Sequence, residues 1–211
     1  MIDTAFFITS FVTLFVIIDP IGLTPMFVAL TQGLSVQKRR AIAIRATLVS
    51  AGILALFAVF GESLLGFIGI SMAAFKIAGG ILLLLTALDM LFQRRAKRRE
   101  DTAEEDDDLD DPSVFPLAIP LIAGPGSIAT VILLAGAQPG FTGLGLSLAV
   151  MVLVLIVTFV FFEAATPLEK LLGKTGINVV SRLLGMLLAA LAVQFMLNGL
   201  QDFGLFAQAP T

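Results

Sequence analysis

The sequence contains no cysteine and no histidine. This absence excludes disulfide bonds, thiolate chemistry and the two strongest protein ligands for zinc. It also removes the side chain that most often carries protons near neutral pH. Charged residues are few, at 14% of the chain compared with about a quarter in soluble domains. We expect no resident metal or cofactor, no catalytic residue and no nucleic-acid partner.

Most of what is present is apolar. Hydrophobic residues make up 58% of the 211, and the mean hydropathy is +1.02. A helix needs about 20 mostly apolar residues to cross a bilayer. Apolar blocks near this length occupy residues 5–30, 41–60, 72–92, 114–137, 141–162 and 181–200. The sequence predicts an all-α membrane protein with six transmembrane helices and the lipid bilayer as its surroundings.

The segments between these blocks are short, with one exception. Residues 61–71 and 166–180 are expected to connect neighbouring spans. Residues 1–13 carry neither a basic start nor a small-residue cleavage site, so we interpret them as part of the first span and not as a signal peptide.

Basic residues predict the orientation. Twelve of the 13 lie in or beside the loops 31–41, 93–112 and 163–181, and Lys76 is the exception. Cytoplasmic loops carry an excess of lysine and arginine. We therefore expect these three loops in the cytoplasm and both termini outside.

The one long polar segment is a charged linker. Residues 94–99 are mostly basic, and residues 100–111 contain nine carboxylates. A calcium loop would need a central glycine and a closing glutamate at fixed positions, and neither is present. We interpret residues 93–112 as a solvated linker between two halves, 1–92 and 113–211.

The two halves share a short repeat. Residues 62–71 (ESLLGFIGIS) and 169–178 (EKLLGKTGIN) are identical at six of ten positions, at an offset of 107. Three spans in each half would place the second half upside down in the membrane. Inverted repeats recur in secondary transporters, whose halves move about a fixed central site. The sequence predicts two inverted three-helix repeats, and the alternative is a chance match in a chain rich in leucine and glycine.

Spans 1 and 4 are each interrupted at a similar place. Span 1 contains Pro20, Gly22 and Pro25, and span 4 contains GPG at 124–126. A proline inside a helix removes a hydrogen bond, and in lipid the freed backbone groups must face protein or an internal cavity. We predict that both helices are broken near the midplane and that the breaks form a solute site. The alternative is a pair of ordinary kinks.

The intramembrane carboxylate of Asp19 lies at the first break. A charge near the bilayer centre costs at least roughly 2.5–3.5 kcal/mol, so Asp19 is predicted to bind a substrate amine, Na⁺ or a proton, or to cap the helix that follows. Hydroxyls near the breaks could contact a solute or bond to their own helices. The candidate substrate-binding residues are Asp19, Pro20, Gly22, Thr24, Pro25, Gly124, Pro125, Gly126 and Ser127.

Four segments together resemble the MarC family of membrane proteins. They are DPIGLTP at 19–25, FKIAGG at 75–80, PLAIPLIAGPGS at 116–127 and VQFMLNG at 193–199. The resemblance extends over nearly the whole chain, although Asp19 stands where many members carry asparagine. It implies a bacterial inner-membrane protein with a fold similar to that of LysE-type exporters. It also implies transport of small neutral amino acids such as glycine or alanine.

The leading hypothesis is therefore a secondary transporter that works by alternating access, with Na⁺ or H⁺ as the candidate coupling ion. One alternative is an exporter of other small metabolites or toxic compounds, which would use the same architecture. Another is a non-transporting membrane scaffold. An intramembrane enzyme is disfavoured because no complete set of catalytic roles is present. The many small residues permit a homo-oligomer.

Overall fold

The computed structural model describes residues 4–92, 111–137 and 141–204. Every regular element in these residues is helical. In chain order they are α1 (Thr4–Ile18), α2 (Pro20–Leu30), α3 (Val36–Ile68), α4 (Met72–Leu91), η1 (Ser113–Ile122), α6 (Pro125–Ala135), α7 (Phe141–Glu163) and α8 (Ala165–Asp202).

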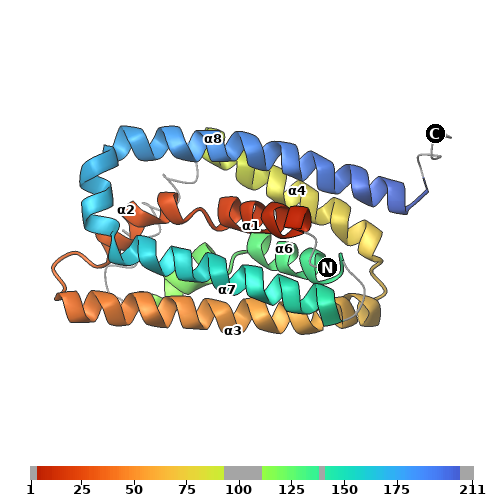
Figure 1. Cartoon of the computed structure of the whole chain (residues 1–211), viewed down its shortest axis with the longest axis horizontal. Coiled ribbons are helices and arrows are strands. Elements are labelled where there is room, and N and C mark those ends of the chain that lie inside the picture. The colour runs from red at the N-terminus through yellow and green to blue at the C-terminus, as the bar shows by residue number, and fades with distance from the viewer. Residues whose placement is uncertain (1–3, 93–110, 138–140, 205–211) are drawn as a thin grey trace.

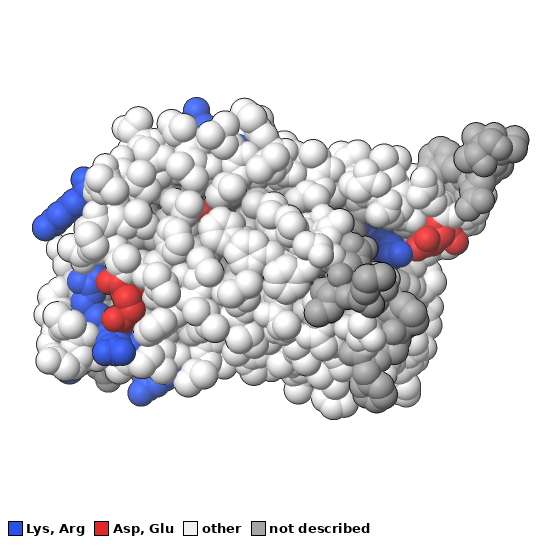
Figure 2. All heavy atoms as spheres, in the orientation of Figure 1, with Lys and Arg blue, Asp and Glu red and all other residues white. Residues whose placement is uncertain are grey.

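The helices have the length and composition of membrane spans. Five helical segments are long and apolar enough to cross a bilayer, and there are six if η1 and α6, which meet at an angle of 57°, form one bent span. Large apolar side chains are exposed on the outer faces of four helices, including Leu48, Leu85, Ile156 and Leu187. Figure 2 shows most of the visible charged side chains near the two ends of a long body, with one small acidic patch between them. This distribution fits an integral membrane protein with several spans.

The broken helices lie in the middle of the bundle (Figure 1). α8 runs along α4 on one side, and α7 and α3 lie on the other. α1 and α2 lie between these two layers, with α6 beside α1. The elements that carry the predicted site are therefore surrounded by the long helices α3, α4, α7 and α8.

The helix boundaries correct two predicted connections. α3 begins after the N-cap Ser35, includes the basic residues of the predicted loop 31–41, and continues to Ile68, so most of residues 61–71 are helical. Residues 166–180 likewise belong to α8, which bends at Gly173. Figure 1 shows that the first turns of α8 cross the end of the bundle before this bend. The glycines and polar residues of these two segments lower the hydropathy, but most of them lie within helices.

The two copies of the repeat have different local structures. In the first copy, Gly69 adopts φ 82° and ends α3, with its N–H donating to the Gly66 carbonyl at 3.1 Å. In the second copy, the left-handed residue is Gly173, which aligns with Gly66. The sequence identity at 62–71 and 169–178 is therefore not matched by the same backbone geometry.

α4 and α8 approach each other at glycines. A Cβ atom placed on Gly80 would lie 2.8 Å from the Ala192 carbonyl oxygen, and one on Gly199 would lie 2.8 Å from the Ala73 carbonyl oxygen. Small residues allow this close approach of membrane helices. The two helices consequently form one tightly packed layer.

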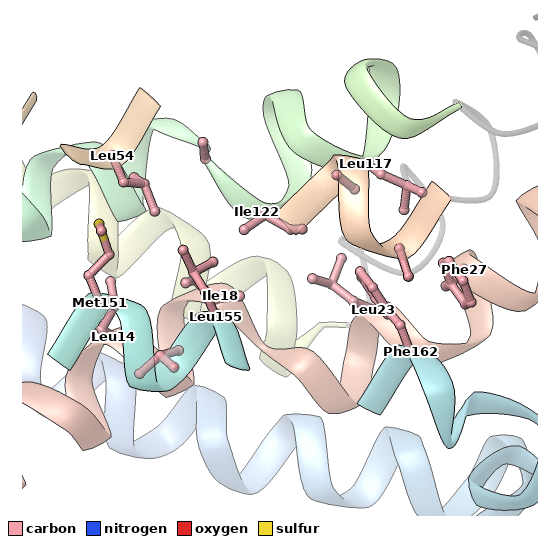
Figure 3. Packing of buried hydrophobic residues seen from close by; sticks show 14 of the residues in the cluster. Leu14, Ile18, Leu23, Phe27, Leu54, Leu117, Ile122, Met151, Leu155 and Phe162 are labelled. Carbon is pink, nitrogen blue, oxygen red and sulfur yellow. The ribbon is translucent and has the colours of Figure 1, made fainter. Parts of the chain in front are cut away.

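A large apolar cluster holds the broken helices against α3 and α7. Figure 3 shows Leu14 and Ile18 of α1, Leu23 and Phe27 of α2, and Leu155 of α7 converging within it. A second, smaller cluster joins α1 to α4 and α8 through Val16, Ile17, Leu83, Ala87, Met90, Leu188 and Ala192. α1 therefore packs on both of its sides, which fixes the position of the break at its end.

The first half of span 4 is more irregular than the sequence analysis expected. Phe115 and Ile119, each followed by a proline, adopt extended backbone angles, and both of these X–Pro peptide bonds are cis. The hydrogen bonds that remain join residues five positions apart, such as the bond from the Ala123 N–H to the Ala118 carbonyl at 2.8 Å. A proline disfavours helical angles at the residue before it, and two prolines four residues apart prevent a regular helix here.

Candidate functional site

The break between α1 and α2 is a single residue. Asp19 adopts left-handed angles (φ 56°, ψ 62°) and is only 2% exposed. Its N–H donates to the Phe15 carbonyl at 2.9 Å, and its own carbonyl accepts from the Leu23 N–H at 2.9 Å. Left-handed angles are unfavourable for residues with a side chain, although aspartate tolerates them when it bonds locally. The chain therefore changes direction at Asp19 with little loss of backbone hydrogen bonding.

The Asp19 carboxylate caps α2. Its Oδ1 accepts from the Gly22 N–H at 3.0 Å. Pro20 occupies the first helical position, where its missing N–H has no consequence. A Cβ atom on Gly22 would lie 2.1 Å from Asp19 Oδ2, so only glycine leaves room for the carboxylate in this position.

The break between η1 and α6 is built differently. Gly124 is the N-cap of α6, Pro125 follows it, and no side chain caps the helix. Since the first N–H groups of a helix have no intrahelical acceptor, the N–H groups of Gly126 and Ser127 remain available. Ser127 is buried, and buried N–H groups are nearly always hydrogen-bonded. The start of α6 is therefore suited to hold an anionic group.

The two breaks lie close together. A Cβ atom on Gly126 would be 3.3 Å from Cγ2 of Ile17, which is two residues before Asp19, and 3.6 Å from Cδ2 of Leu83. The absence of a side chain at Gly126 thus lets α6 begin against the last turn of α1. Figure 1 shows α2 and α6 leading away from this central region in opposite directions.

The chemistry of the two breaks is complementary. One presents the Asp19 carboxylate and the other presents uncapped N–H groups at the positive end of a helix dipole. On the same face of α6 as Gly126, one turn later, the buried hydroxyl of Thr130 has no hydrogen-bond partner. A small molecule with one cationic and one anionic group would match this pair of ends.

The other predicted site residues are placed less directly. The Thr24 hydroxyl donates to the Pro20 carbonyl at 3.0 Å and is fully buried, so it bonds within its own helix. Pro25 is half-buried inside α2, and Pro125 is exposed. Of the candidates in span 4, Gly126 lies against Ile17, two residues before Asp19.

Two polar residues of span 6 bond to each other. Gln194 Nε2 donates to Asn198 Oδ1 at 2.8 Å. Both residues belong to α8, one turn apart, so the bond lies within one helix.

Aromatic and basic side chains close one end of the bundle. The Phe27 ring stacks on Phe162 with centroids 4.5 Å apart. The Arg39 guanidinium lies 5.7 Å from the Phe27 centroid and donates to the Thr166 hydroxyl at 3.1 Å. Arg40 pairs with Glu163 at 3.9 Å. These contacts link α2, α3, α7 and α8 at the end of the bundle where α2, the second half of span 1, finishes.

Sequence reasoning found the breaks but missed the difference between them. The signal was present, since aspartate is a good N-cap and glycine has no side chain with which to cap. It also missed a group of hydroxyl residues on α1, at Thr9, Ser10 and Thr13, which face a cavity of their own. Their spacing along one helix face was the available signal.

The model of a family described as "MarC family integral membrane protein" matches residues 4–203. A UPF0056 membrane protein of Methanocaldococcus jannaschii is 37% identical, over 94% of this chain and 98% of its own length. A UPF0056 membrane protein of Archaeoglobus fulgidus is 41% identical, over 94% and 93%. The UPF0056 membrane protein YvbG of Bacillus subtilis is 38% identical, over 93% and 95%. No solved structure matches the chain.

Proposed function

The chain belongs to the MarC family of integral membrane proteins, and on this premise we propose that it is a secondary transporter of small polar solutes. The first candidates for the solute are small neutral amino acids. The proposed site lies where the two breaks meet, between the Asp19 carboxylate and the start of α6 at Gly126 and Ser127.

The observation that carries this proposal is the complementarity of the two breaks. A buried carboxylate at the end of α1 and uncapped N–H groups at the start of α6 match the ammonium and the carboxylate of an amino acid. Asp19 and Ser127 are each only 2% exposed, and residues of α1 and α2 on both sides of Asp19 belong to the apolar cluster in Figure 3. Discontinuous helices whose ends face a common region are a recurring feature of transport sites.

An arrangement of two inverted repeats is part of the proposal. It is supported by the pairing of corresponding elements, since α4 packs on α8 and α3 packs on α7. It is also supported by α2 and α6, which both have 11 residues and a proline at the first position. In this arrangement the halves 1–92 and 113–211 would move against each other about the central site.

The contacts at the end closed by Phe27 and Arg39 are weak enough to break and re-form during a transport cycle. They consist of one ring stack, one cation–π contact and exposed or half-exposed polar pairs, each of which contributes about 1 kcal/mol or less. Breaking them would separate α2 from α7 and open a path from this end to Asp19. Na⁺ or H⁺ coupling would act at the Asp19 carboxylate.

We also propose an orientation in the cell membrane. Arg39, Arg40 and Arg45 lie at the start of α3, and Lys76 and Asp202 form an ion pair between α4 and the last turn of α8. The excess of basic residues favours the cytoplasm for the first of these ends. Both termini would then be outside.

The direct test is counterflow in proteoliposomes. Vesicles loaded with unlabelled alanine are expected to accumulate radiolabelled alanine transiently and saturably, and glycine is expected to compete. The same measurement with a Na⁺ or a pH gradient identifies the coupling ion. Empty vesicles and vesicles that contain denatured protein are the controls.

A scaffold would give a different result. If monodisperse wild-type protein gave no counterflow with any member of a panel of amino acids and small polar metabolites, the transport proposal would be rejected.

A further inference from the structure

A cavity lies away from the two breaks. It has a volume of about 210 Å³ and lies between α1, α4, the last turns of α6 and the last part of α8. Bulk water occupies about 30 Å³ per molecule, so the cavity has room for a solute of several heavy atoms together with water. Its polar lining residues are Thr9, Ser10, Thr13, Lys76, Gln194 and Asn198.

The Ser10 hydroxyl indicates that something polar is missing from this cavity. Several hydroxyls of the described residues donate to the carbonyl four residues earlier, as those of Thr24, Thr31, Thr47, Ser50 and Thr158 do. Ser10 is 1% exposed, and its hydroxyl has no partner. Leaving a buried hydroxyl unsatisfied is unfavourable, so a ligand or water is expected at this position.

Lys76 supplies the charge. Its Nζ lies 2.6 Å from Asp202 Oδ2, and the two side chains remain 24% and 46% exposed. An ion pair with this exposure is weak and exchangeable. The ammonium can therefore move from Asp202 to the carboxylate of an incoming molecule. The released Asp202 carboxylate is not left as a buried charge, because its side chain is 46% exposed.

We propose that this cavity binds a small organic carboxylate, with the Lys76 ammonium and the Ser10 hydroxyl donating to its oxygens. Without ligand, the Asp202 carboxylate pairs with the Lys76 ammonium, and the carboxylate of the ligand displaces it from this pair. The amides of Gln194 and Asn198, which already bond to each other at 2.8 Å, form the polar wall beside it.

The cavity lies on one side of the broken helix. Thr13 precedes Asp19 by six residues, which is roughly 9 Å along a helix at 1.5 Å per residue. That a transported solute binds in this cavity before it reaches the two breaks is an inference that rests on the proposed transport function. The binding itself does not, and it is measured without transport.

The experiment is a binding measurement by saturation-transfer-difference NMR on the full chain in nanodiscs. The probes are propionate, alanine, propionamide and alaninamide. Propionate and alanine share a carboxylate, which the two amides lack. We expect the two carboxylates to bind in competition with each other, and the amides to give no signal.

The variants separate a ligand contact from a structural role. Lys76→Met is expected to weaken binding at least about tenfold, because a charge-assisted hydrogen bond is lost. Ser10→Ala is expected to weaken it about three- to tenfold. Asp202→Asn removes the competitor and is expected to strengthen binding about two- to fivefold, an effect that a merely destabilised protein would not show. Lys170→Met, at an exposed lysine elsewhere on α8, is the matched control and should leave binding unchanged.

The outcomes distinguish this site from the one at the breaks. Binding that survives Asp19→Asn and is lost in Lys76→Met supports the proposal, even if counterflow fails. Binding of alanine without propionate, also lost in Lys76→Met, supports it and identifies a zwitterion as the ligand. Equal binding of the amides, binding that is unaffected by Lys76→Met and Asp202→Asn, or no binding of either carboxylate would overturn it.

Discussion

Gly80→Ala is expected to lower the free energy of unfolding by about 1–3 kcal/mol, the usual cost of overpacking a well-packed interior. The new Cβ atom would lie 2.5 Å from Met196 Cγ and 2.8 Å from the Ala192 carbonyl oxygen. The methionine side chain can move, but the carbonyl belongs to the backbone of α8, so the two helices must separate. Gly80→Leu should prevent a stable fold, because α4 and α8 then lose their close packing.

The matched control is Gly52→Ala in α3. A Cβ atom at Gly52 would have no heavy atom within 4 Å, so only the helix propensity changes, and alanine is favoured by up to about 1 kcal/mol. Unfolding in mixed detergent micelles, followed by circular dichroism, measures both variants. Equal stabilities of Gly80→Ala and Gly52→Ala would contradict the glycine-mediated packing of α4 on α8.

Gly22→Ala is expected to abolish transport and to lower the free energy of unfolding by at least about 2 kcal/mol. The Cβ atom would collide with the Asp19 carboxylate, which must then leave its position as the N-cap of α2. The lost cap accounts for about 1 kcal/mol. Moving a buried carboxylate away from its partner adds about 1–3 kcal/mol.

A double-mutant cycle tests the cause of this effect. On an Asp19→Ala background the carboxylate is absent, so adding Gly22→Ala should cost less than about 0.5 kcal/mol. The two changes would then be strongly non-additive, as expected for residues in contact. Additive losses in the cycle would mean that Gly22 is required for a reason other than space for Asp19. Stability is measured by the same detergent titration, and transport by alanine counterflow.

The broken helices could be predicted from the sequence because their causes are local. Pro20 and Pro125 each stand at the first position of a helix, and the residues before them cannot continue the preceding one. The capping role of Asp19 follows from its residue type and position. The irregular path through Phe115 and Ile119 rests on the same rule, applied to prolines that the sequence analysis had placed inside a helix.

The closeness of the two breaks could not be predicted in this way. It depends on Gly126 packing against Ile17, which are 109 positions apart in the chain. The ends of α3 and the start of α8 were predicted at the wrong residues for another reason. Hydropathy falls at residues 61–71 and 166–180, but a helix that leaves the apolar part of a membrane can continue when its backbone hydrogen bonds remain intact. Pro167 fits because it lies in the first turn of α8.

The cavity beside Ser10 could not be predicted, although the hydroxyls of Thr9, Ser10 and Thr13 share one helix face in the sequence. Thr9, Ser10 and Thr13 have the composition of an ordinary transmembrane helix, in which hydroxyls usually bond to their own backbone. Only the structure distinguishes Ser10, which has no partner, from Thr24, which does.

The most direct test of the central claim is solute protection of a thiol at the start of α6. The chain has no cysteine, so Ser127→Cys introduces a single, nearly isosteric thiol at the proposed site, and Ser50→Cys on α3 is the buried control. During counterflow, Ser127→Cys should react with a small methanethiosulfonate reagent at a rate that falls as alanine is added, with a half-effect near the concentration that half-saturates transport. Ser50→Cys should react slowly and without regard to alanine. A Ser127→Cys protein that transports alanine while its thiol remains unreactive, or reacts at a rate that alanine does not change, would show that the solute does not pass between the two breaks.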